Sequence, residues 1–132
     1  MNLLITALYT SLLGLVFLCL SIQVIKVRRK LVISLGDGNN EDLQRATRAH
    51  ANFNEYVPIC ILLLLVAELT SQADIFLHIC GIVLVYGRIA HGYGLITHSG
   101  ASLGRISGVL STFAVLIALS LWNLFTVIST IT

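Results

Sequence analysis

Apolar residues fall in four long blocks along the chain, and each block is long enough to cross a membrane as a helix. The blocks cover residues 3–28, 41–70, 74–97 and 103–131, and short polar stretches separate them. One crossing of a hydrocarbon core about 30 Å thick needs about 20 apolar residues at a rise of about 1.5 Å per residue. The pattern therefore predicts an all-α membrane protein, a single-domain bundle of four transmembrane helices.

The polar stretches supply signals for helix ends. Residues 36–40, Gly-Asp-Gly-Asn-Asn, are typical of an exposed turn, and Glu41 and Asp42 after them suit a helix N-terminus. The second helix has a polar first half and an apolar second half. Single polar residues elsewhere have ordinary interpretations: we expect Glu68 to be solvated, His78 to be a structural histidine, and Trp122 to pack between subunits.

Composition excludes a soluble globule of this size. Hydrophobic residues make up 57% of the 132 residues and charged residues only 11%, against about a quarter in ordinary soluble domains. The three cysteines lie in apolar blocks without a CxxC pair, so we expect no disulfide framework and no metal site. We expect the chain to be surrounded by membrane lipid and to bind no nucleic acid.

All basic residues lie on one side of the predicted bundle. By the positive-inside rule, the connection between the first two helices and that between the last two face the cytoplasm, and both chain ends face the opposite side. The C-terminal residues carry no eukaryotic sorting signal, which favours a bacterial inner membrane. The basic residues are Lys26, Arg28, Arg29, Lys30, Arg45, Arg48, Arg88 and Arg105.

Ionisable residues inside spanning segments indicate a candidate functional site, because they are costly in a membrane. Arg45, Arg48, Asn52 and Glu55 are spaced three, four and three residues apart. At about 100° per residue this spacing confines them to a stripe of roughly 80° on one helix face. That face must turn away from lipid.

The other three helices bring ionisable residues to the same zone. Arg88 and His91 lie three residues apart on the third helix, Arg28 ends the first, and Arg105 begins the fourth. Arginines outnumber the available acids there, which points to an anionic ligand held by guanidinium groups, with Glu55 available for an ammonium group. In the alternative interpretation, the arginines reach lipid headgroups and pair with acids only to hold the bundle together.

The motif RAHxNxxExxP over residues 48–58, with QVIKVRR over residues 23–29 and GRIAH over residues 87–91, resembles the MAPEG family. These are membrane-associated proteins in eicosanoid and glutathione metabolism, among them microsomal glutathione transferases, leukotriene-C synthase and microsomal prostaglandin-E synthase. The resemblance covers nearly the whole chain. It implies a four-helix subunit that assembles as a homotrimer, with glutathione as co-substrate bound between subunits near the cytoplasmic face.

The resemblance also assigns roles to residues. Arg105 matches the catalytic arginine that faces the glutathione sulfur, and His50 would come from the adjacent subunit. A guanidinium close to the thiol, whose pKa is about 8.5, favours the thiolate, which attacks a hydrophobic electrophile or reduces a lipid hydroperoxide. No separate general base is needed. The glutathione-binding residues are Arg28, Arg48, His50, Asn52, Glu55, Tyr56, Arg88 and His91.

Two departures from the family pattern limit this assignment. Leu95 stands where the eicosanoid-synthesising relatives have a tyrosine, and Ala51 replaces an arginine of some members. Tyr93 lies about 160° from Leu95 around the helix and is a poor substitute. We therefore predict a glutathione transferase or peroxidase and no leukotriene or prostaglandin synthesis. The alternative is a membrane protein without catalytic activity, either a small organic-ion transporter or a scaffold that retains the polar motif.

Overall fold

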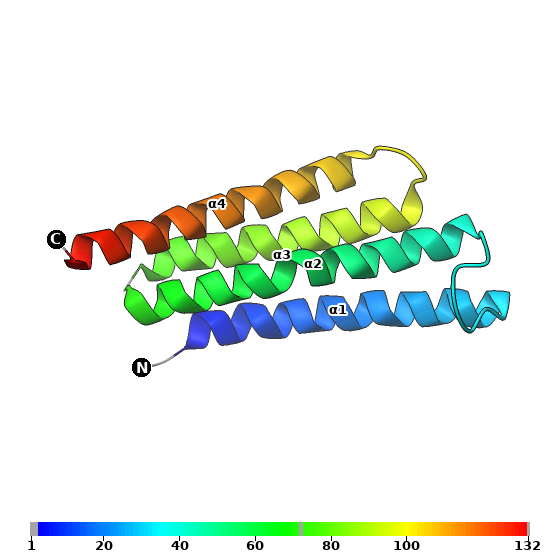
Figure 1. The fold of residues 1–132 in the computed structure, drawn as a ribbon, viewed down its shortest axis with the longest axis horizontal. Helices are drawn as coiled ribbons and strands as arrows, with labels where there is room; N and C mark the ends of the chain where they lie inside the picture. Colours follow the sequence, from blue (N-terminus) through cyan, green and yellow to red (C-terminus); the bar gives the residue numbers. More distant parts are fainter. Residues whose placement is uncertain (1–2, 72, 132) are drawn as a thin grey trace.

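The computed structural model describes residues 3–71 and 73–131 and is a bundle of four antiparallel helices (Figure 1). They are α1 (Leu4–Leu31), α2 (Glu41–Thr70), α3 (Asp74–Thr97) and α4 (Leu103–Ile131), and the described residues form no strand. All four are long and apolar enough to cross a membrane. The predicted all-α class with four spanning helices is confirmed.

The helix bounds agree with the expected ranges except at the end of α1. This helix continues to Leu31, three residues beyond the predicted end, because Arg28, Arg29 and Lys30 are favourable in the last turn of a helix and nothing in that turn breaks it. Val32 then ends the helix in a left-handed conformation, with φ of 57°. At the start of α2, the Asn40 side chain caps the helix by accepting a hydrogen bond from the Leu43 backbone N–H at 3.1 Å.

The middle of the bundle is formed by α2 and α3. Within the described residues α1 packs on α2 and α3, whereas α4 packs on α3 and α2 and does not reach α1. Glycines allow the close approach of α3 and α4: a Cβ built on Gly108 would lie 2.5 Å from the Gly87 carbonyl oxygen and 2.6 Å from the His91 Cβ.

Because successive helices run in opposite directions, the α1–α2 and α3–α4 connections lie at the same end of the bundle (Figure 1). We call this end the basic end, because all basic residues but the deeper Arg88 lie near it.

The opposite end corrects the prediction for Glu68. Its carboxylate is half-buried and accepts hydrogen bonds from the Ile5 and Thr6 backbone N–H groups, at 2.9 and 2.7 Å. The first N–H groups of a helix have no partner within the helix, and α1 has no side-chain cap of its own. Glu68 of α2 therefore serves as a cap for α1, and is not merely solvated.

Two other residues near this end have partners within their own chain. His78 Nδ1 lies 3.0 Å from the Tyr9 hydroxyl, which agrees with a structural role for this histidine. Trp122 Nε1 donates a hydrogen bond to the Ser71 hydroxyl at 3.2 Å, and its ring lies 4.8 Å from that of Phe76. The indole also remains partly exposed, so packing of Trp122 between subunits stays a prediction.

Candidate functional site

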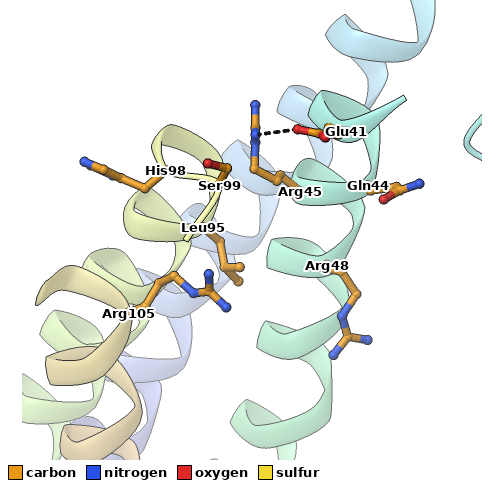
Figure 2. A pocket seen from close by; sticks show the side chains of 8 residues that line it. All are labelled: Glu41, Gln44, Arg45, Arg48, Leu95, His98, Ser99 and Arg105. Carbon is orange, nitrogen blue, oxygen red and sulfur yellow. Dashed lines mark ion pairs between the residues drawn. The ribbon is translucent and has the colours of Figure 1, made fainter. Parts of the chain in front are cut away.

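A cavity of about 360 Å³ opens at the basic end between α2, α3 and α4 (Figure 2). The α2 side carries two arginines of the predicted stripe, Arg45 and Arg48, while Arg105 extends from the first turn of α4 toward them. This volume falls within the range of about 300–1,000 Å³ that small-molecule sites occupy. The lining residues are Glu41, Gln44, Arg45, Arg48, Leu95, His98, Ser99 and Arg105.

Ion pairs neutralise two of the three arginines that line this cavity. Arg45 pairs with Glu41 at 3.6 Å and also with Asp42, and Arg48 lies 3.5 Å from Glu55. Arg105 donates to the Gly100 carbonyl oxygen at 2.7 Å. Within residues 3–71 and 73–131, Arg105 pairs with no carboxylate, so an anion can neutralise its charge without breaking an ion pair.

Arg88 connects three helices in the core beside the cavity. Its side chain is almost completely buried; it donates to Asn52 Oδ1 at 3.0 Å and to the Gly108 carbonyl oxygen at 3.2 Å. Its guanidinium carbon lies 5.7 Å from the centre of the Tyr56 ring, within the range of a cation–π contact. Arg88 does not line the cavity, so the structure places it where it positions Asn52 and Tyr56.

The other predicted glutathione-binding residues do not line this cavity. Arg28 shares a neighbouring cavity of about 610 Å³ with Arg48, and its side chain donates to the Gly36 carbonyl oxygen at 2.9 Å. His91 shares another, of about 380 Å³, with Arg105. His50 lies elsewhere, on the α1 side of α2, where its ring is 4.7 Å from that of Phe17. One subunit therefore does not gather all the predicted residues around one cavity.

Several lining residues were not among the predicted site residues. Arg45 belongs to the predicted stripe, so its spacing was a usable signal. Gln44 precedes Arg48 by four residues on α2, so helix spacing was a usable signal for it as well. His98 and Ser99 gave none, because they reach the cavity only through the way the α3–α4 connection folds back toward α2. Leu95, already noted as a departure from the family pattern, lines the cavity and offers no hydroxyl group there.

Fold and site together define an integral membrane protein of four helices with a cationic cavity at one end of the bundle. The model of the MAPEG family matches residues 6–125. This chain belongs to the MAPEG family, which confirms the resemblance seen in the motifs.

Two relatives from Escherichia coli add a location. The chain is 38% identical over 121 residues to "Inner membrane protein YecN" of strain K12, an alignment that covers 92% of this chain and 91% of the relative. The same identity and coverage hold for "Inner membrane protein YecN" of strain O6:H1 CFT073. With four apolar helices, these matches support an integral inner membrane protein, while the relatives' names state no reaction.

Proposed function

We propose that this protein is a glutathione-dependent membrane transferase or peroxidase in which Arg105 stabilises the glutathione thiolate. The observation that carries the proposal is the position of the Arg105 guanidinium, without a carboxylate partner among the described residues, in a cavity that Arg45 and Arg48 also line. A site of this charge suits a small molecule with several anionic groups, and glutathione has two carboxylates, one ammonium group and a thiol.

The α2 residues are suited to hold the peptide part of glutathione. The Arg48–Glu55 pair is about half exposed on both partners, and exposed ion pairs contribute only about 0–1 kcal/mol. A ligand with both charges can therefore replace this pair at small cost, its carboxylate binding Arg48 and its ammonium group binding Glu55. Arg88 keeps Asn52 and Tyr56 in position beside them.

Arg105 is suited to act on the sulfur. A free thiol with a pKa of about 8.5 is only about 3% ionised at pH 7, and a guanidinium within hydrogen-bonding distance favours the anion. In conjugation, the thiolate forms a bond from sulfur to the electrophilic carbon while the leaving group departs. In peroxide reduction, the thiolate sulfur bonds to one peroxide oxygen while the O–O bond breaks, and the other oxygen takes up a proton and leaves as the alcohol. The sulfenic acid that forms then reacts with a second glutathione to give the disulfide and water.

A hydrophobic co-substrate can approach Arg105 from the membrane side. The cavity that Arg105 shares with His91 is otherwise lined by Ala101, Ile106, Val109 and Leu110, all apolar. Because Leu95 supplies no hydroxyl group to the neighbouring cavity, we do not extend the proposal to leukotriene or prostaglandin synthesis.

The proposal includes an assembly and an orientation. We propose a homotrimer in which His50, which lies outside the cavity of its own subunit, contributes to the glutathione site of an adjacent subunit. We also propose that the basic end faces the cytoplasm, because basic residues favour that side of a bacterial inner membrane.

A second candidate is a protein without catalytic activity, either a small organic-ion transporter or a scaffold. Arg88 favours it, because a buried guanidinium without a carboxylate partner in the described part of the chain is typical of ion pathways as well as of enzyme sites. A transporter would bind its ligand without ionising the thiol.

Calorimetric titration of the purified protein with glutathione in neutral detergent tests the proposal. We expect saturable binding that Arg48→Gln weakens about tenfold or more, because hydrogen bonds to charged groups contribute about 1.5–3 kcal/mol. Arg29→Gln is the matched control, since Arg29 is exposed and lines none of the cavities described above. Absence of binding, or equal losses in both variants, would contradict the proposal.

A further inference from the structure

A separate cavity of about 410 Å³ lies between the last two turns of α1, the start of α2 and the end of α3. It shares no lining residue with the cavity that contains Arg105. Its polar lining includes Gln23, Lys26 and Lys30 of α1. Because these residues are spaced three and four apart, they form one face of the helix.

The two lysines bring positive charge that the chain does not neutralise. Lys26 and Lys30 are both exposed, and neither pairs with a carboxylate in the described ranges. Asp42 is the acid that lines the cavity, but its carboxylate is already paired with Arg45. The cavity therefore retains a positive charge suited to an anionic group.

The rest of the cavity is apolar. Val27, Leu31 and Ile96 line it beside the two lysines. A site that combines cations with an apolar wall at the end of membrane-spanning helices suits a lipid headgroup, because the phosphate binds the cations while the glycerol and the first acyl carbons cover the apolar side chains. A free anion would leave the apolar wall uncovered.

We propose that this cavity binds the phosphate headgroup of an anionic glycerophospholipid. The Lys26 and Lys30 ammonium groups bind the phosphate, the Gln23 amide donates a further hydrogen bond, and Val27 and Ile96 contact the upper part of an acyl chain. The lipid site is distinct from the proposed thiol site, and each can exist without the other.

Native mass spectrometry of the full chain in neutral detergent, titrated with phosphatidylglycerol, tests this proposal. We expect Lys26→Gln or Lys30→Gln to weaken binding of the first lipid about tenfold. Arg29→Gln removes the same charge from the same helical turn without touching the cavity, and we expect a change smaller than about threefold. All three residues are exposed, so the variants should fold, which circular dichroism checks.

The outcomes separate a site from general charge attraction. Equal losses in the three variants would overturn the proposal, because they would mean that the lysines act only through the bulk surface charge. Equally tight binding of phosphatidylcholine would overturn the selectivity for anionic lipid. Displacement of the lipid by inorganic phosphate at equal concentration would show that a free anion is the ligand. Arg105→Ala should leave lipid binding unchanged, so this test and that of the thiol site can fail separately.

Discussion

Replacing Glu68 by alanine should loosen the start of α1. The substitution removes both carboxylate oxygens and leaves the buried Ile5 and Thr6 residues with two N–H groups that lose their partner. A hydrogen bond to a charged group contributes about 1.5–3 kcal/mol, and a typical helix cap about 1 kcal/mol. Since Glu68 is only half-buried and water can replace part of the loss, we expect a cost of about 2 kcal/mol for the pair.

Hydrogen–deuterium exchange of the N-terminal part of α1 measures this cost locally. A change of about 2 kcal/mol in the opening free energy corresponds to roughly 30-fold faster exchange of the affected amides. Glu68→Gln, which keeps one acceptor but loses the charge, should fall between the native protein and Glu68→Ala. The exchange is read from peptides that contain residues 5 and 6.

Glu55→Gln is the matched control for this experiment. It makes the same chemical change as Glu68→Gln on the same helix, but Glu55 pairs with Arg48 near the basic end and makes no ion pair or hydrogen bond with α1 among the described residues. Unchanged exchange at the start of α1 in Glu68→Ala would refute the capping role. Equal acceleration by Glu55→Gln would refute its local origin.

Three further predictions concern packing, assembly and orientation. Gly108→Ala should destabilise the protein by about 1–3 kcal/mol in thermal or denaturant unfolding, because the added Cβ meets backbone of α3, whereas Gly14→Ala, with nothing within 4 Å, should not destabilise. Native mass spectrometry should give three chains per particle, and a monomer or dimer would contradict the proposed homotrimer. In a bacterial host, alkaline phosphatase fused to the C-terminus should be active and a fluorescent protein fused there should not fluoresce, because the proposed orientation places the C-terminus on the side opposite the cytoplasm. The reverse pattern would overturn the orientation.

The number of helices and nearly all of their bounds were predictable, because each span needs about 20 apolar residues and the polar stretches between them are unmistakable. The polar face of α2 was also predictable, since helix geometry alone places Arg45, Arg48, Asn52 and Glu55 on one stripe. In the structure, Arg45 and Arg48 of this stripe line the cavity, and Asn52 accepts a hydrogen bond from Arg88.

Contacts between distant parts of the chain were not predictable. Glu68 accepts hydrogen bonds from N–H groups 62 and 63 residues away in the sequence. The spacing of residues within a helix does not reveal that the start of α1 lies beside Glu68 of α2. Arg105 faces Arg48 only because glycines bring α4 close to α3 and the connection before α4 folds toward α2. Helix geometry places His50 about 160° from Arg48 around α2, so their separation was predictable. The contact between the His50 and Phe17 rings was not, because it depends on how α1 packs against α2.

The most direct test of the proposed function is the ultraviolet difference absorbance of thiolate when glutathione is added to the purified protein at pH 7. We predict a saturable signal well above the roughly 3% ionisation of the free thiol. Arg105→Ala should abolish the signal, whereas Arg29→Gln, which removes an exposed charge outside the cavity, should retain it. No thiolate signal from the native protein, or a signal that survives Arg105→Ala unchanged, would contradict the assignment of Arg105 as the group that stabilises the thiolate.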